Sequence, residues 1–420
     1  MKRELKFAGD VQVNSIILVS LNGQTANIEN QVVSIEVYED MLSPFTTLSL
    51  VIKDSLDFIN LFPFVGEEYL KVDIVTPGMD KRIKGKFYIY KIVDRMYMKD
   101  REVIYTIRAA SEEFLTNINT KITKPLTGKI SDTVTMLMGR EGLNTEKSYF
   151  IEETSNKTKM TANFWDPVRC INALGQRAVS VYGSPSYMFF EGRDGFMFKS
   201  INTMLTEPAY TSFTKDNYSR KENAMDASST MDVEQDYKRI TNIDIPVLNN
   251  YIDDIQSGQI KSRIISHDML TKKYTVKDYS VKKDPNAFVL INKSLPYSKY
   301  AIANASSKII NVPKYYGVHN GFGDTGNTQS LQRRMSFFKN LEKYKVQIEV
   351  AGRTDYTVGM IVDLNIPKIS QITKEDTDTR DLIISGKYLV SAMTHYISRS
   401  QHTCKMELVK NSLIFDLGEA

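Results

Sequence analysis

Alternating hydrophobic and polar positions dominate the first 115 residues, and this period-two pattern predicts β-strands because successive side chains point to opposite faces of a strand. Val33, Ile35 and Val37 are expected to share one buried face, and Leu48 and Leu50 begin the next alternation. Glycine and proline separate the runs, which is typical of an antiparallel barrel or sandwich. The predicted strands cover residues 32–37, 47–53, 68–75, 86–94 and 102–109.

The pattern changes between residues 116 and 209, where helical and strand spacing alternate. Residues 131–138 have helical spacing, and Asp166-Pro167 marks a second helix start, since aspartate caps backbone N–H groups and proline tolerates the first helical position. Two aromatic runs, 187–190 and 196–200, flank a glycine-containing turn and predict a hairpin. We therefore expect a small α/β unit here.

Beyond residue 210 the chain returns to strands, interrupted by a long insert. An amphipathic helix is predicted at 328–344, with Leu331, Met335, Phe338, Leu341 and Tyr344 on one stripe. The predicted strands are 240–247, 263–265, 272–279, 346–350, 360–366, 387–393 and 403–409.

The last strands repeat the first. Gly85 and the five residues after it match Gly386 and its successors, an offset of 301 residues, and Val65-Gly66 resembles Val358-Gly359. Gly66, Gly85, Gly359 and Gly386 are therefore the positions that define the repeat. Holding the offset without gaps aligns Val103, Tyr105, Ile107 and Phe114 with Cys404, Met406, Leu408 and Phe415.

These patterns predict an α+β, mainly β chain with two duplicated antiparallel β-barrel domains and α/β insert domains. A duplicated domain suggests a pseudo-symmetric ring in which three chains supply six equivalent units. The predicted domains are residues 1–115 (first barrel), 116–209 (α/β insert), 210–250 with 338–412 (second barrel), 251–337 (insert with the amphipathic helix) and 413–420 (C-terminal tail).

Charge and hydropathy narrow the function. The 54 Lys and Arg residues against 50 Asp and Glu give a net charge of +4 over 420 residues, which is weak for a protein that grips a nucleic-acid backbone. A local basic block at 81–108 either lines a lumen or forms an ordinary solvated or protein-contacting face. The apolar run at 16–21 is too short for a membrane span, and no signal peptide is evident.

The sequence offers little for catalysis, cofactors or metals, and we expect no catalytic, cofactor-binding or metal-binding residues. Cys170 and Cys404 are expected in the core, and two cysteines make no disulfide framework. We do not expect the four histidines, His267, His319, His395 and His402, to cluster with the cysteines into a metal site. His395 and His402 flank a predicted turn and could face each other, but two histidines without a third ligand make a weak metal site. His267 and Asp268 are adjacent, so a strand points them apart.

The order of the segments resembles the baseplate hub protein of contractile-tailed (myovirus) bacteriophages, which is related to the tube-like domains of type VI secretion spike proteins. The resemblance covers nearly the whole chain and is carried most clearly by residues 163–190, 262–276 and 333–367. It implies that the two barrels are tail-tube-like and that a homotrimer forms a pseudo-sixfold ring.

The resemblance also implies partners and location: the ring joins the tail tube protein to a central spike protein, contacts baseplate wedge proteins, and lets DNA pass transiently without specific binding. Because the chain stops at Ala420, soon after the second barrel, we expect the spike to be a separate chain. The protein would belong to the tail baseplate of the virion and assemble in the cytoplasm of a bacterial host.

Two alternatives remain at this point. One is a wall-degrading or receptor-binding protein of the same particle, which predicts a pocket with convergent carboxylates and a perturbed pKa. The other is a sixfold distal-tail protein with similar barrels.

Overall fold

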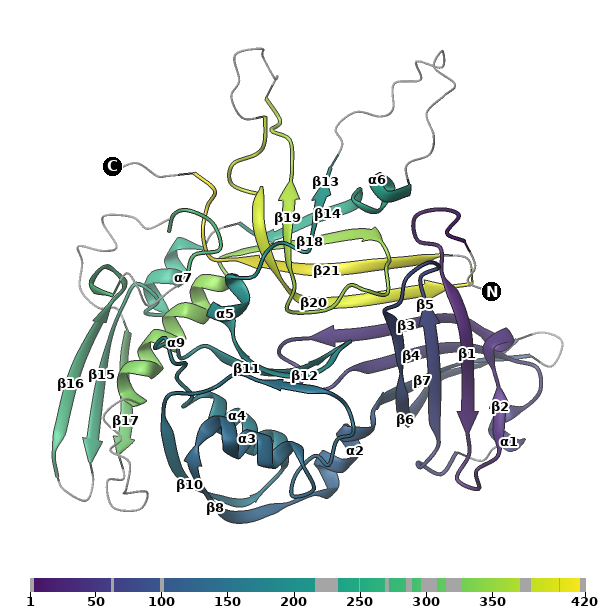
Figure 1. Ribbon diagram of the computed structural model, residues 1–420, viewed down its shortest axis with the longest axis horizontal. Coiled ribbons are helices and arrows are strands. Elements are labelled where there is room, and N and C mark those ends of the chain that lie inside the picture. The colour runs from purple at the N-terminus through teal and green to yellow at the C-terminus, as the bar shows by residue number, and fades with distance from the viewer. Residues whose placement is uncertain are drawn as a thin grey trace.

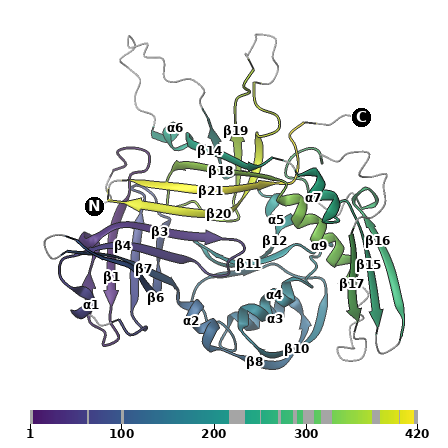
Figure 2. The ribbon, with the colours of Figure 1, turned by 180° about the vertical axis from the view of Figure 1, so that it is seen from behind.

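The computed structural model describes residues 4–61, 64–98, 102–215, 233–248, 250–268, 272–284, 289–295, 308–314, 327–370, 379–399 and 401–415. The chain is α+β and mainly β, and one 13-stranded sheet system runs through it. Figures 1 and 2 show two β blocks side by side, with smaller α/β units packed against them. Among the described residues, no helix is long and apolar enough to cross a membrane.

The first block follows the predicted strands closely. Leu48, Leu50 and Ile52 are buried as expected, and so are Ile35 and Val37, but Val33 is 42% exposed. A bulge between Val32 and Ser34 shifts the strand register there and turns Val33 outward. The block contains β1 (Gln12–Val19), β2 (Thr25–Asn27), η1 (Glu29–Gln31), β3 (Val32–Asp40), β4 (Thr47–Asp54), α1 (Phe58–Leu61), β5 (Tyr69–Val75), β6 (Arg82–Tyr97) and β7 (Val103–Ser111).

The α/β unit after β7 has its own core, in which Cys170 is fully buried. Asp166 is the N-cap residue of α4, as predicted, but its side chain makes no cap hydrogen bond. It pairs with Lys121 instead, and Asn117 Oδ1 accepts the Val168 N–H at 2.9 Å. The unit contains α2 (Glu112–Asn119), β8 (Ile122–Lys129), α3 (Ile130–Met138), β9 (Tyr149–Ile151), β10 (Lys157–Trp165), α4 (Pro167–Gly175), β11 (Tyr187–Gly192), β12 (Gly195–Ser200) and α5 (Ile201–Leu205).

The second block reproduces the strand order of the first. The first block runs β3-β4-β7-β6-β5, and the second runs β14-β18-β21-β20-β19. Beside the last strand of each series, β1 pairs with β5 in antiparallel fashion, whereas β13 pairs with β19 in parallel. The second block contains β13 (Thr211–Thr214), α6 (Val233–Tyr237), β14 (Ile240–Val247), β18 (Tyr344–Ala351), β19 (Ile361–Asn365), β20 (Gly386–Ser398) and β21 (His402–Lys410).

Bulges at equivalent places allow the two blocks to be aligned residue by residue. The β6–β7 ladder shifts between Ile89 and Lys91, and the β20–β21 ladder shifts between Val390 and Ala392. With these bulges matched, Ala109 corresponds to Leu408, and Tyr105 to Cys404. The ungapped alignment predicted for the outer strand is therefore wrong by two residues, because the first hairpin is longer beyond the bulge. Phe114 and Phe415 do not correspond either, since Phe114 lies in α2 and Phe415 follows β21.

The remaining unit lies outside the second block and is built around α9. This helix ends at Leu341, and Tyr344 already belongs to β18. Leu341 is buried, but Leu331, Met335 and Phe338 of the predicted apolar stripe are only half-buried. A polar row fills the buried face instead: Gln332 donates to the Ser262 carbonyl at 3.1 Å, and Asn340 accepts from Gln259 at 2.9 Å. The unit contains α7 (Tyr251–Gln256), β15 (Lys261–Asp268), β16 (Tyr274–Ser280), η3 (Val281–Lys283), β17 (Lys308–Lys314) and α9 (Asn327–Leu341).

Candidate assembly edges and buried polar junction

The two blocks are joined by backbone pairing between β20 and β3, which we call the seam. The first part of β20 pairs with β19, whereas Ala392–Ser398 pairs with β3 over Asp40–Ser34. The change of partner falls at the bulge, where the Ser391 carbonyl accepts the Met41 N–H at 2.9 Å. A bulge bends and twists a strand, so β20 leaves its own block and continues the sheet into the other (Figure 1).

β6 and β14 are the strands equivalent to β20 and β3. Among the described residues, the edges of β6 and β14 that correspond to the seam have no partner strand. β6 pairs with β5 over Arg82–Tyr88, but the corresponding side of Lys91–Tyr97 has no partner strand among the described residues. β14 corresponds to β3, and within the described part of the chain it pairs with β18 alone. Exposed strand edges present unpaired N–H and C=O groups that bind another strand readily.

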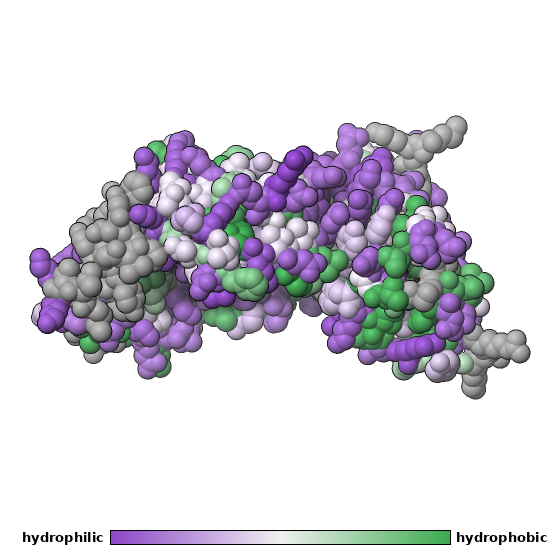
Figure 3. All heavy atoms as spheres, turned by 90° about the horizontal axis from the view of Figure 1, so that it is seen from below, coloured by the Kyte–Doolittle hydropathy of each residue, from purple (hydrophilic) through white to green (hydrophobic). Residues whose placement is uncertain are grey.

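Large hydrophobic side chains accompany the free part of β6. Tyr97 is 76% exposed and Met96 58% exposed. Seen from below, hydrophobic residues gather on the end of the molecule formed by the first block, whereas much of the remaining visible face is hydrophilic (Figure 3). Such patches mark protein contact surfaces more often than isolated exposed side chains do. Exposed members in this block are Leu21, Leu56, Leu61, Val65, Tyr90, Met96, Tyr97 and Met98.

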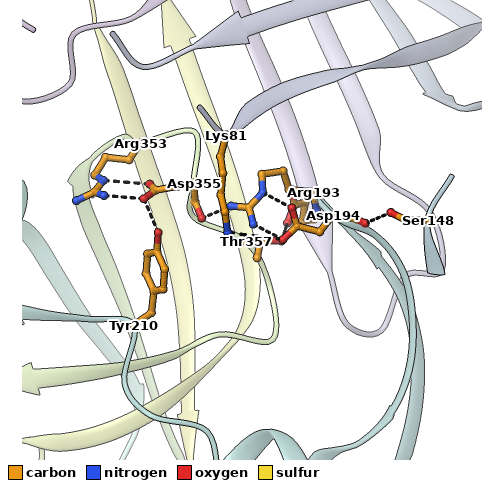
Figure 4. Close-up of polar contacts among 9 residues, drawn as sticks. Lys81, Ser148, Arg193, Asp194, Tyr210, Arg353, Asp355 and Thr357 are labelled. Carbon is orange, nitrogen blue, oxygen red and sulfur yellow. Dashed lines mark hydrogen bonds and ion pairs between the residues drawn. The ribbon is translucent and has the colours of Figure 1, made fainter. Parts of the chain in front are cut away.

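A polar junction fastens the α/β unit to both blocks (Figure 4). Arg193, at the β11–β12 turn, donates to the Asp355 carbonyl, pairs with Asp194, and receives support from Thr357, whose Oγ1 accepts the Arg193 N–H at 3.1 Å. Asp355 in turn binds Arg353 through two contacts of 3.0 and 2.6 Å. Bidentate arginine–carboxylate pairs fix geometry as well as charge. Lys81 of the first block and Tyr210 reach the same network.

Two buried carboxylates lie beside this junction. Glu39 Oε2 accepts from Thr357 Oγ1 at 2.7 Å and from the Val358 N–H at 3.1 Å. Burial nevertheless raises the pKa of Glu39 to about 7. Glu191 accepts from the Thr46 N–H, Ser111 Oγ and Lys147 Nζ at 2.8, 2.7 and 2.6 Å.

Glu39 and Glu191 line one pocket of about 470 Å³, together with Lys147, Arg193 and Asp194. A pocket with convergent carboxylates and a raised pKa is what the enzyme alternative predicts. However, three donors from three segments already hold Glu191, which therefore ties the first block to the α/β unit. Glu39, whose pKa is about 7, can exchange a proton near neutral pH.

The structure places the other predicted residues as follows. Cys170 is buried in α4, where burial raises the pKa of its thiol to about 11. His267 is exposed on β15. Gly66 and Gly359 precede β5 and β19 with positive φ angles of 113° and 82°. Gly85 pairs with Val72 and Gly386 with Leu364, so both occupy equivalent ladder positions.

The expectation that the histidines do not cluster with the cysteines is wrong. The β20–β21 register sets His395 directly opposite Cys404 and brings His402 next to both. His395 Nδ1 lies 3.0 Å from His402 Nε2, and Cys404 Sγ lies 3.2 and 3.6 Å from these two nitrogens. Burial lowers the pKa of His395 to about 4, lowers that of His402 well below its ordinary value, and raises that of Cys404. The spacing of His395 and His402 across the predicted turn indicated that these two side chains could face each other, but it did not indicate that Cys404 joins them.

The fold is that of phage tail proteins. The tail protein from Neisseria meningitidis MC58 covers 94% of this chain and 96% of its own with a TM-score of 0.56 and 10% identity. The 43 kDa tail protein of prophage MuSo2 from Shewanella oneidensis covers 95% and 98%, with a TM-score of 0.55 and 8% identity. No family model matches the sequence.

Among curated proteins, the chain is similar to one described as "Probable baseplate hub protein gp334" from Vibrio phage KVP40. The two are 22% identical over 433 residues, which cover 98% of this chain and 97% of that protein. The similarity thus extends across both β blocks and both α/β units.

Proposed function

We propose that this protein is a structural baseplate hub protein of a contractile phage tail, in which three copies form a pseudo-sixfold ring. The observation that carries the proposal is the correspondence between the seam and the free edges. Inside one chain, the outer part of β20 binds β3. The equivalent outer part of β6 and the equivalent strand β14 are both free among the described residues. Pairing β6 of one copy with β14 of the next repeats the seam and closes the ring.

The seam also supplies the register of this contact. Tyr396 lies opposite Glu36, and Thr394 opposite Tyr38. Transferred through the ladders of the two blocks, with the further bulges at Val93–Met96 and Asp244–Val247 taken into account, these pairs become Met96 opposite Asp244, and Val93 opposite Val247. Arg95, next to Met96, and Asp244 are both exposed in the single chain. This register therefore brings opposite charges close together, which favours pairing.

The similarity to a hub protein supports the partners that we assign. The ring joins the tail tube protein to a central spike on a separate chain, and baseplate wedge proteins contact its outside. The division into two barrels at 1–115 and at 210–250 with 338–412, with inserts at 116–209 and 251–337 and a tail at 413–420, follows from the same proposal. The protein would act in the virion's tail baseplate after assembly in the bacterial host cytoplasm.

The genome would pass through the ring without specific binding. A net charge of +4 is compatible with this, since tight phosphate binding needs many cationic contacts. Part of the basic block at 81–108 is balanced by acids: Arg82 lies 3.3 Å from Asp73, and Lys86 lies 3.8 Å from Glu112. The protein therefore needs no catalytic group or cofactor for this role.

Native mass spectrometry of the full chain tests the ring, with a species of three times 47.9 kDa expected. Arg95→Asp and Asp244→Arg should each weaken the ring, because each brings like charges close together at the β6–β14 contact, and the double variant should restore it. Lys84→Asp is the matched control, since Lys84 is exposed on the part of β6 that already pairs with β5. A wild-type hexamer would favour the distal-tail alternative. A monomer in the presence of tube and spike proteins would contradict the ring.

The pocket at Glu39 gives the wall-degrading alternative a specific observation of its own. A carboxyl with a pKa of about 7 can act as a general acid near neutral pH. Clearing of a bacterial wall suspension by the purified wild-type chain, abolished by Glu39→Gln, would establish that activity. We expect no clearing, because the neighbouring Glu191 is held by three donors.

A further inference from the structure

We propose that His395, His402 and Cys404 form a structural metal site suited to Zn²⁺. The three side chains lie on one face of the β20–β21 hairpin and are fully buried. Their nitrogen and sulfur atoms all lie within 4.8 Å of one another. Imidazole and thiolate are the ligands that zinc prefers in proteins.

The distances agree with three corners of a coordination tetrahedron. Zinc–nitrogen and zinc–sulfur bonds of about 2.0 and 2.3 Å place two nitrogens about 3.3 Å apart, and nitrogen and sulfur about 3.5 Å apart. The observed separations are 3.0 Å between the nitrogens, and 3.2 and 3.6 Å from the sulfur to each of them. Shifts of a few tenths of an ångström would admit the ion.

Hydrogen bonding alone accounts poorly for this arrangement. A neutral imidazole has one N–H and one lone pair. If His402 donates to His395 Nδ1, the thiol proton of Cys404 has no acceptor on either facing nitrogen. If the thiol donates to His395, the 3.0 Å contact between the rings has no hydrogen bond. A cation removes the conflict, because it accepts one lone pair from each of the three atoms.

The surrounding backbone fixes His402 in place. Its N–H donates to the Gly9 carbonyl at 2.8 Å, and its carbonyl accepts the Gly352 N–H at 2.8 Å. A Cβ at Gly352 would lie 2.2 Å from the His402 ring, so only glycine allows the ring to lie flat against this strand. Ligand rings held by their neighbours are a property of built metal sites.

The thiol has a backbone partner as well. The Arg353 backbone donates a hydrogen bond to the Cys404 side chain. Backbone donors of this kind commonly support metal-bound sulfur. His395 also lies opposite Val37 of β3. The ion would therefore clamp the hairpin at the seam between the two blocks.

Metal content of the full-length protein tests the site. After expression with added zinc and extensive dialysis, we expect about one zinc ion per chain by mass spectrometry of the metal. Cys404→Ser should lower this content about tenfold or more, because one of the ligands is lost. Cys170→Ser, at the other buried cysteine, and His267→Gln, at an exposed histidine, are the controls and should retain the ion.

Zinc that persists in a folded Cys404→Ser protein, or its absence from the wild type, would overturn the proposal. If Cys404→Ser does not fold, wild-type protein refolded with Co²⁺ decides the question. A thiolate-to-cobalt charge-transfer absorption supports the site, and a cobalt spectrum without it excludes Cys404 as a ligand.

Discussion

The two β blocks share a strand order but differ in what lies along their edges. In the second block the outer part of β20 is covered by β3, whereas in the first the equivalent part of β6 is free among the described residues. β3 is covered by β20, but in the part of the chain that the structure describes its counterpart β14 pairs only with β18. The same strand arrangement thus forms a contact within the chain at β20 and β3, and leaves the edges of β6 and β14 available for a contact with another chain.

Equivalent positions have diverged according to this difference. Glu39 of β3 is buried and bonded to Thr357, while the residue in its place, just beyond the end of β14, is Leu248, which is 42% exposed. Ser111 of β7 donates to Glu191, and its counterpart Lys410 donates instead to the carbonyls of Ile383 and Ser385. The two blocks therefore share the same strand pairing, and the side chains at the ends of the strands differ because each block contacts different neighbouring segments.

The largest expected effect is the difference in stability between a substitution on the covered edge, at β3, and one on the free edge, at β14. Val37, on β3, is 1% exposed and lies opposite His395 in the seam, and its counterpart in β14 is Ile245. Val37→Asp should lower the free energy of unfolding by about 4 kcal/mol or more, since it buries an unpaired charge. Ile245→Asp should lower it by less, about 1–2 kcal/mol, because Ile245 is half-buried against the core of the second block, but it should abolish the trimer.

Urea denaturation of both variants measures the free energy of unfolding, and native mass spectrometry shows whether each variant still forms the trimer. A matched loss of stability in Ile245→Asp would show that β14 is already covered within the single chain, and would remove the basis for the ring.

A second comparison uses the paired glycines Gly386 and Gly85. At Gly386, where φ is +116°, a Cβ would lie 2.3 Å from Ile414, so Gly386→Ala combines backbone strain with a clash and should cost about 3 kcal/mol. At Gly85 the nearest atom to a Cβ is in the Phe87 ring at 3.3 Å, and Gly85→Ala should cost about 1 kcal/mol or less. Thermal unfolding of the two variants, measured in parallel, gives the difference in stability loss. Equal losses would contradict the stronger backbone strain and clash that we assign to Gly386.

The last comparison concerns a gain in stability that appears at Glu39 only at high pH. Because its pKa is about 7 in the folded protein and 4.5 when unperturbed, the native state binds the proton more tightly. The stability from this proton is complete below pH 4.5 and is lost as the pH rises through 7. Glu39→Gln should therefore match the wild type near pH 4.5 and be more stable by about 3 kcal/mol at pH 8, because a pKa raised from 4.5 to about 7 corresponds to a free energy of about that size. Urea titrations at the two pH values check this, and a variant less stable at pH 8 would show that the ionised carboxylate is needed there.

Much of the fold could be predicted from residue patterns, because the strands of both blocks alternate and the Gly85 and Gly386 segments match. The pattern could not show the bulge that exposes Val33, since a bulge breaks the alternation from which strands are inferred. It also missed the row of Gln332, Ser336 and Asn340 on α9, where hydrogen bonds replace hydrophobic contact.

The seam and the cluster of His395, His402 and Cys404 could not be predicted from the sequence, for a related reason. Both depend on which strands pair and in what register, and the outer hairpin differs by two residues between the blocks. A shift of that size keeps every side chain on its face, so hydrophobic patterning is equally satisfied by either alignment. His395 and Cys404 meet only in the register that the structure has.

The two free edges have a kinetic consequence for assembly. In a ring of three, joining two chains forms one contact and leaves one β6 edge and one β14 edge open, as in a single chain. The third chain forms two contacts at once, and the second of these is intramolecular, with a high effective concentration. The dimer should consequently be scarce at equilibrium, and the ring should appear with the cube of the chain concentration and dissociate slowly once closed.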